Sequence, residues 1–316
     1  MSEPWLVYWP NRFVDWRSKM SHLLKLAPLL LVVGLVVLLS SSRNETIPLP
    51  EEIAIGITSD WMRDGIWDDG NAEYSVYDAE WRRYGRLNKG RVCMLIVKEP
   101  WQAKLDTKSE GGQPADFDVL KLNVIRDINT GVYTYEQMAS VFARRDTGAL
   151  RKYVTGSLEA CGQTSTMLMK GQLSTRSYWG DQGNRDQNWP ANAIPEDALP
   201  LYLRGLMTGE LPTSISVFPS LMAGRLPRLE PTTFSVERKL DVTVKTAAGT
   251  FNTVSFTLSY GRENRVFQFD STAKGRTLVR FRHSNGTEYT LAKTERMPYW
   301  QMNGPADEAW WPKRLR

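Results

Sequence analysis

The chain of 316 residues has few of the side chains on which enzymes most often rely. It contains two cysteines, Cys93 and Cys161, and two histidines, His22 and His283. It has no P-loop, no G-x-S-x-G nucleophile motif and no H-E-x-x-H zinc motif. The sequence therefore gives no support to P-loop nucleotide hydrolysis, α/β-hydrolase chemistry or zincin-type proteolysis. Paired carboxylates remain open, because such acids need only meet in space.

A basic face for nucleic acid is also lacking. The formal net charge is only +5, and charges of both signs are mixed along the chain. Nucleic-acid binding would need a clustered basic surface. Apolar residues make up 41% of the chain, which is enough for a buried core.

Only one long apolar run is present, at 26–39, bounded by Leu26 and Leu39. A spanning helix needs about 17–25 residues and the core of a signal peptide about 7–15, so this run lies between the two classes. Basic residues precede it, which predicts a cytoplasmic N-terminus. We expect 23–42 to be a signal anchor after a cytoplasmic tail at 1–22, with Met20 as an alternative start. The alternative is a signal peptide cleaved near Ser42.

Either reading predicts that the rest of the chain lies outside the cytoplasm. The anchored form would sit in an inner membrane with a periplasmic domain, and the cleaved form would be periplasmic or secreted. No cysteine follows the run closely, so a lipoprotein anchor is not expected. The membrane itself is thus the first predicted partner.

The exported part reads as a short linker at 43–52, a β domain at 53–305 and an aromatic and basic tail at 306–316. Apolar and β-branched runs predict strands at 72–85, 90–101, 117–128, 151–169 and 264–270. Two short helices are expected. The first, at 134–145, carries a capping-box pattern in Thr134 and Gln137. The second, at 195–207, has Pro200 near its start.

Two hairpins are expected near the C-terminus. In the first, apolar residues fall on one face if Val244 lies opposite Val254 and Leu240 opposite Leu258, which predicts a loop at 248–250. The second turns at Asn285-Gly286, a strong hairpin signal. If that turn has two residues, His283 faces Glu288 across the strands.

The stretch "VKTAAGTFNTVSFTLSYGRENRVFQFDSTAKGRTLVRFRHSNGTEYTL" resembles a family of uncharacterised bacterial exported or membrane-anchored β-proteins. The upstream "DGNAEYSVYDAEWRRYGR" and "LEACGQT" resemble companion stretches of such proteins. The resemblance implies a mainly β fold: a curved antiparallel sheet forming an open half-barrel, akin to periplasmic lipoprotein carriers, with two or so short helices. It supplies no catalytic residue and no cofactor.

Cys93 and Cys161 form the first candidate site. An oxidising compartment favours a disulfide between them, whereas the apolar surroundings of Cys93 favour a free thiol. Catalysis by Cys161 would need a histidine base, and His283 is the only exported one. The hydrogen-bond geometry of such a dyad cannot be derived from sequence.

Two further groups have both a functional and a structural interpretation. The acids of "DGIWDDGNAE", namely Asp64, Asp68, Asp69 and Glu73, match no calcium loop, and turn formation explains them. At the C-terminus, aromatic and basic residues suit a membrane or partner contact, although the tryptophans could instead fold back onto the sheet. These residues are Trp310, Trp311, Lys313 and Arg314.

The sequence therefore favours a non-catalytic binding or structural module of the cell envelope, with no cofactor and no metal site. Its expected ligand is an apolar molecule, a lipid, a lipoprotein or a protein partner. The alternative is an extracytoplasmic hydrolase that uses carboxylates or Cys161. A cleft in which such groups converge would distinguish the two.

Overall fold

The computed structural model describes residues 52–57 and 60–310, which belong to one compact unit, 49–316. The run from Leu26 to Leu39, the 1–22 tail and the residues Trp311, Lys313 and Arg314 lie outside the described residues, as does the side chain of Trp310. Among the described residues, no helix is long and apolar enough to cross a bilayer.

The unit is built on one open sheet that is antiparallel except where β10 pairs with β11. The order is β10-β11-β12-β13-β14-β15-β16-β1-β2-β4-β5-β6-β7-β8-β9, with β3 paired to β2. The strands are β1 (Ala72–Arg83), β2 (Arg86–Gln102), β3 (Thr107–Lys108), β4 (Phe117–Asn129), β5 (Thr134–Arg144), β6 (Leu150–Glu159), β7 (Gly162–Met169), β8 (Gln172–Arg176), β9 (Arg185–Asn188), β10 (Ile194–Pro195), β11 (Ser214–Phe218), β12 (Thr232–Thr246), β13 (Gly249–Tyr260), β14 (Glu263–Asp270), β15 (Leu278–His283) and β16 (Glu288–Met297).

Helical structure in the described part is short. The helices are η1 (Asp60–Arg63), η2 (Gly65–Asp68), η3 (Glu196–Ala198), α2 (Leu199–Tyr202), η4 (Leu203–Leu206), η5 (Tyr299–Gln301) and η6 (Pro305–Trp310). The helix predicted at 195–207 is confirmed as the continuous stretch η3–α2–η4, with Pro200 in its second turn. Every residue of α2 and η4 is buried.

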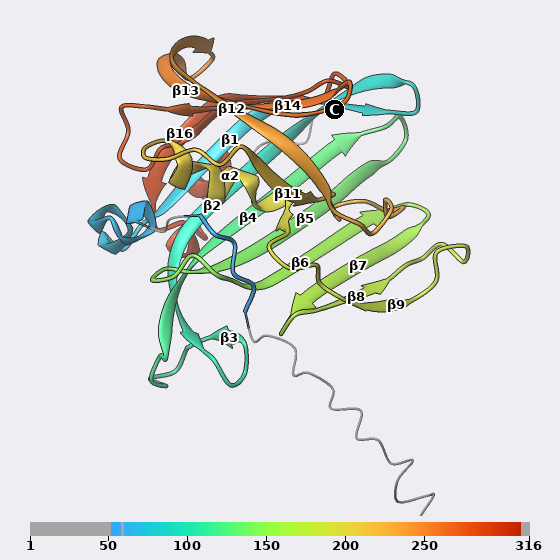
Figure 1. Cartoon of the computed structure of the whole chain (residues 1–316), viewed down its shortest axis with the longest axis horizontal. Helices are drawn as coiled ribbons and strands as arrows, with labels where there is room; N and C mark the ends of the chain where they lie inside the picture. The colour runs from blue at the N-terminus through green and yellow to red at the C-terminus, as the bar shows by residue number, and fades with distance from the viewer. Residues whose placement is uncertain (1–51, 58–59, 311–316) are drawn as a thin grey trace, which may run out of the picture. The chain divides into compact units, whose positions relative to one another are not determined.

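The sheet is strongly curved around this helical stretch. Glu196 forms an ion pair with Arg265 of β14, and the next residue, Asp197, accepts a hydrogen bond from Tyr153 of β6. In the sheet order β14 and β6 are seven strand positions apart, which would be about 33 Å in a flat sheet. Two adjacent side chains cannot span that distance, so the two halves of the sheet must turn toward each other. Figure 1 shows α2 lying between them.

Both faces of the sheet bury apolar side chains, but unequally. The main core fills the inner face and includes Trp61, Trp67 and the buried side of the helical stretch. On the outer face a small cluster forms around Tyr74, Val76, Cys93, Leu95 and Met297, against which Tyr299 and Met302 pack. The segment before the predicted C-terminal contact residues therefore covers the outer face near β1 and β2.

The helix predicted at 134–145 is wrong, because this segment is β5. Its residues pair with β4 on one side and β6 on the other. Burial alternates along it, with Tyr135, Gln137, Ala139, Val141 and Ala143 buried. The Gln137 side chain bonds to Arg126 and Ser157 rather than to a helix N-terminus. Tertiary pairing thus overrides the local capping pattern.

The first C-terminal hairpin is confirmed, but its predicted register is wrong. Val244 lies opposite Phe251, and the strands close across a two-residue turn between Thr246 and Gly249. A β-bulge between Lys239 and Val242 shifts the pairing, and Leu240 within it is 56% exposed. Because the bulge shifts the pairing, one register cannot describe both halves of the hairpin. The prediction assumed a single register along the whole hairpin and was therefore wrong.

The second hairpin also turns where expected, and the strand at 264–270 is present as β14. Its loop has three residues, 284–286, because the N–H of His283 bonds to the carbonyl oxygen of Thr287 at 2.8 Å. Gly286 adopts a positive φ of 93° that closes this loop. His283 therefore faces Thr287, and Glu288 lies opposite Arg282. The predicted pairing of His283 with Glu288 is wrong by one residue.

Candidate ligand-binding cavity

A cavity of about 320 Å³ lies between the inner face of the sheet and two segments that cover it. One cover is the start of the helical stretch, Glu196 to Pro200. The other is the strap, which we define as residues 219–229, between β11 and β12. The volume falls at the lower end of the ~300–1,000 Å³ typical of small-molecule sites. Most of its lining is apolar: Trp81, Met94, Val124, Pro200, Pro219, Met222, Ala223, Pro227, Phe267, Leu278, Phe281 and Tyr289.

A hollow of about 240 Å³ between β4, β5 and β6 is smaller than typical small-molecule sites. Another, of about 440 Å³, is lined by the ion pair of Lys121 with Glu99 and by further polar groups. An apolar ligand would have to desolvate that ion pair. The cavity under the strap is thus the better candidate.

The strap is held by side chains of the sheet rather than by strand pairing. Thr155 of β6 donates to the carbonyl oxygen of Leu221 at 3.0 Å, and Thr164 of β7 donates to that of Gly224 at 2.6 Å. Both threonines are buried. A buried backbone carbonyl without a donor is costly, so these inward polar side chains determine where the strap lies.

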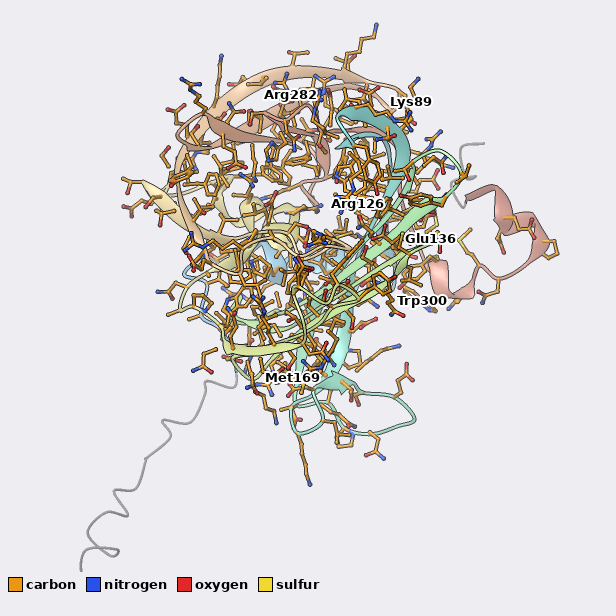
Figure 2. All side chains as sticks on the ribbon, turned by 90° about the vertical axis from the view of Figure 1, so that its right-hand side faces the viewer. Lys89, Arg126, Glu136, Met169, Arg282 and Trp300 are labelled. Carbon is orange, nitrogen blue, oxygen red and sulfur yellow. The ribbon has the colours of Figure 1, made fainter. Side chains whose placement is uncertain are left out.

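Arg126 of β4 is the polar centre of the cavity wall. It is 8% exposed, and its guanidinium donates to Gln137 Oε1 at 2.8 Å, to the Tyr289 hydroxyl at 3.0 Å and to the Met222 carbonyl oxygen at 2.6 Å. It also lies over the ring of Trp81, 4.8 Å from the centroid. In Figure 2 Arg126 lies well inside the unit. Within the described residues its hydrogen-bond acceptors are all neutral.

Asp197 fixes the helical cover to both the sheet and the strap. It accepts hydrogen bonds from the hydroxyls of Tyr153 and Ser220, at 2.5 and 2.7 Å, and from the N–H of Leu221 at 3.3 Å. Burial raises the pKa of its carboxyl above the ordinary value, although these donors and the charge of Arg126 act against the rise. Burial and the Asp197 carboxylate likewise raise the pKa of Tyr153 well above its usual range.

Glu196 and His283 line another part of the wall. Glu196 forms a bidentate pair with Arg265 at 2.8 and 3.0 Å. His283 Nε2 lies 3.2 Å from Glu263 Oε1, and its Nδ1 accepts the N–H of Asn285 at 3.0 Å. Burial lowers the pKa of His283, and the neighbouring Arg265 adds to this effect. The imidazole is therefore neutral at neutral pH and has both ring nitrogens occupied.

This arrangement does not support a cysteine–histidine dyad. Cys161 lies in the exposed turn between β6 and β7 and does not line the cavity, whereas His283 does. Because Glu263 and the Asn285 N–H take up the two ring nitrogens, His283 has no free position for a thiol. The carboxylates that do meet here, Glu196 and Asp197, were not identified from the sequence. Their hydrogen bonds to Tyr153, Ser220, the Leu221 N–H and Arg265 hold the cover in place.

The disulfide between Cys93 and Cys161 is not formed in this structure, where both residues are free. Through the sheet register, Cys93 is level with Ile125, Met138 and Gly156, three strands away on β6. Three interstrand steps amount to about 14 Å, whereas bridged cysteines need Cα atoms within about 7 Å. Burial raises the pKa of the Cys93 thiol to about 11, so it behaves as a small apolar side chain.

The acidic segment at 64–73 diverges instead of forming a metal site. Asp68 pairs with Arg145 and Lys98, Asp69 with Arg296, and Glu73 with the buried Arg204, while Asp64 accepts the N–H of Ile66. Hydrogen bonds from Arg145 and Lys98 lower the pKa of Asp68 to about 2, and one from Arg296 lowers that of Asp69 to about 2. Among the described residues, no group of three or more His, Cys, Asp or Glu side chains is placed to hold a metal.

Comparison with known proteins gives no further assignment: no family model matches the chain, and neither a curated protein nor a solved structure matches it significantly.

Proposed function

We propose that this chain is a non-catalytic binding module of the cell envelope, and that the cavity under the strap holds the apolar chain of a lipid or lipid-bearing ligand. The observation that carries the proposal is a mostly apolar cavity between a curved open sheet, a short helix and a strap. An open half-barrel akin to periplasmic lipoprotein carriers is also what the resemblance to uncharacterised bacterial exported β-proteins implies. The predicted membrane segment at 23–42 would keep the module at its source of lipid.

The polar groups of the wall suit an amphipathic ligand. A small number of placed polar groups fixes the orientation of a ligand in a mostly apolar site. Arg126 provides a buried cation whose three acceptors are neutral, and Glu196, Arg265 and His283 provide a second polar region. The acyl chain would lie along the aromatic and aliphatic wall, with its polar end near one of these groups.

A hydrolase is the second candidate, because Asp197 has a raised pKa and lies in the cavity wall. The partners of the two acids argue against it. The Asp197 carboxylate oxygens accept bonds from Tyr153, Ser220 and the Leu221 N–H, and Glu196 is engaged by Arg265. Both acids therefore serve to fix the cover, and neither is free to activate a water.

Photo-crosslinking in membranes tests the binding proposal on the full chain. The probe is a palmitate that carries a diazirine, and labelled peptides are located by mass spectrometry. We expect label on strap and sheet residues of the cavity, such as Met222 and Phe281. The Ala223→Trp variant, which places an indole in the cavity, should lose this label, and the matched Ala247→Trp variant on an exposed hairpin turn should keep it. Label confined to residues outside the cavity would contradict the proposal.

A further inference from the structure

The tip of the β1–β2 hairpin combines exposed cations with exposed apolar side chains. Its sequence, "RRYGRLNK" at 82–89, contains four cations and no acid. Arg82, Arg86 and Lys89 are exposed, and Arg83 is half-buried. Tyr84 is 59% exposed and Leu87 40% exposed, although both are large and hydrophobic. Lys89 lies at one end of the sheet, with Met169 toward the opposite end (Figure 2).

These cations differ from most others of the unit. Other cations of the unit are neutralised in salt bridges, as Arg91 is by Asp78 and Arg145 by Asp68. Within the described residues, none of the four tip cations forms a salt bridge; the side chain of Arg82 donates to backbone carbonyl oxygens. Lys89 has Glu80 as its cross-strand neighbour, but the two are not paired at salt-bridge distance. The tip thus presents net positive charge to solvent.

An adjacent turn extends the apolar part of this surface. The β4–β5 turn, 130–133, presents Val132 fully exposed, and its Tyr133 hydroxyl lies 2.9 Å from that of Tyr84. The Tyr84 hydroxyl also lies 2.6 Å from that of Tyr135. Tyr84 is held there with a positive φ of 53°, which a tyrosine rarely adopts. The exposed ring is therefore fixed in place by contacts with the next turn.

The same surface adjoins the cavity. Trp81, which lines the cavity, directly precedes the tip. Arg82 donates to the carbonyl oxygen of Asn285, another lining residue, and a side chain added at Gly286 would meet Arg82 and Leu87 at 3.4 Å. The exposed Arg282 lies at the same end of the unit as Lys89 (Figure 2). A binding partner with a flat surface that contacted the tip would thus lie beside the cavity wall.

We propose that the β1–β2 tip, with Val132 of the next turn, docks on the surface of an anionic phospholipid membrane. Clustered cations attract acidic headgroups, while tyrosine and aliphatic side chains insert at the boundary between headgroups and acyl chains. Charge complementarity favours this occupant over a neutral protein surface, because no acid of the tip offsets its cations. A role for this contact in exchanging the ligand of the cavity rests on the proposed function, whereas the contact itself does not.

Environment-sensitive fluorescence on the reconstituted full chain tests this contact. In a Cys161→Ser background, which leaves only the buried Cys93, Leu87→Cys is labelled with a nitrobenzoxadiazole dye. The chain is placed in vesicles of phosphatidylcholine alone or with added phosphatidylglycerol. We expect a blue shift, and quenching by spin-labelled lipid, only with phosphatidylglycerol. The same dye at Leu105→Cys, exposed in the β2–β3 turn at the other end of β2, should not respond.

Charge variants complete the test. Replacing Arg82, Arg86 and Lys89 with glutamine should abolish the blue shift, whereas glutamine at three exposed lysines elsewhere, Lys104, Lys239 and Lys274, should preserve it. Circular dichroism checks that both triple variants are folded. A response that is equal on neutral vesicles, absent at Leu87→Cys or unchanged in the tip variant would overturn the inference. Because the dye reports the tip and the diazirine probe reports the cavity, either proposal can fail alone.

Discussion

Arg126 Nη2 donates a hydrogen bond to the carbonyl oxygen of Met222 across 2.6 Å, joining the middle of the sheet to the strap. The same guanidinium bonds to Gln137 and Tyr289. One buried side chain thus ties together β4, β5, β16 and the strap. These bonds hold the shape of the cavity, and they come from Arg126, a polar residue at a core-facing position of β4 where the alternation predicts an apolar side chain.

Replacing Arg126 with methionine should loosen the strap. The change leaves three buried acceptors without donors, and each unsatisfied group costs about 1–3 kcal/mol. We expect a loss of roughly 3 kcal/mol in the free energy of unfolding and faster hydrogen exchange at 219–227. Arg228→Met, at a strap position whose side chain is 82% exposed, is the matched control. Unchanged exchange in the Arg126 variant would show that the strap is held by its other contacts.

The buried pair of Arg204 and Glu73 should be essential for stability. Arg204 is completely buried, and its two Nη atoms bond to the Glu73 carboxylate at 3.0 and 2.8 Å. Removal of one partner of such a pair leaves a buried charge uncompensated, which costs about 3–5 kcal/mol. Arg204→Met should show this loss in chemical unfolding, and adding Glu73→Gln should recover part of it. If the single variant lost less than about 1 kcal/mol, the pair would be no stronger than a surface salt bridge.

Asp197 should make stability fall as pH rises. Its pKa in the folded protein is raised by burial, so the folded state holds the proton more tightly than the unfolded state does. Its contribution is fully present below the unfolded pKa of about 4 and is lost as pH rises through the raised folded pKa. Asp197→Asn lacks this titration, so the stability of wild type relative to the variant should fall as pH rises. A difference independent of pH would contradict the assignment.

Asp68 and Asp69 should act in the opposite direction. Hydrogen bonds from Arg145 and Arg296, respectively, are the main reason that the pKa of each carboxyl is lowered to about 2. Their stabilisation is present above the unfolded pKa of about 4 and is lost as pH falls toward 2. Thermal unfolding of Asp68→Asn and Asp69→Asn should show lower stability than wild type, and the difference should shrink as the pH is lowered. A loss of stability that grew on acidification would contradict the lowered pKa values.

The two thiols should differ in reactivity. Cys161 is exposed, whereas Cys93 is buried and its pKa is raised to about 11. Ellman's reagent should modify one thiol per native chain and two after denaturation without reductant. A Cys161→Ser variant should show none in the native state. Two thiols that appear only after reduction would show that the disulfide forms after all.

Much of the fold follows from local patterns in the sequence. Apolar and β-branched runs located β1, β2, β4 and β14, and the Asn285-Gly286 turn located the last hairpin. The patterns failed where long-range contacts decide, as in β5 and at the bulge opposite β13. A bulge changes the register midway, and a local helix cap cannot compete with pairing on both sides.

The cavity was harder to predict than the sheet. One signal was present: along β4, Leu120, Leu122, Val124 and Ile128 alternate toward the core, and Arg126 interrupts them. A cation at a core-facing position predicts a buried polar site. The strap gave no such signal, because its position depends on Thr155, Thr164 and Gln182, which are distant in sequence.

Native mass spectrometry tests the central claim most directly, on the full chain released with mild detergent from the membranes of its own host. The account predicts a bound adduct of lipid mass, which Ala247→Trp retains and Ala223→Trp loses. A bare protein mass in wild type, or an adduct that survives equally in both variants, would contradict binding in the cavity under the strap.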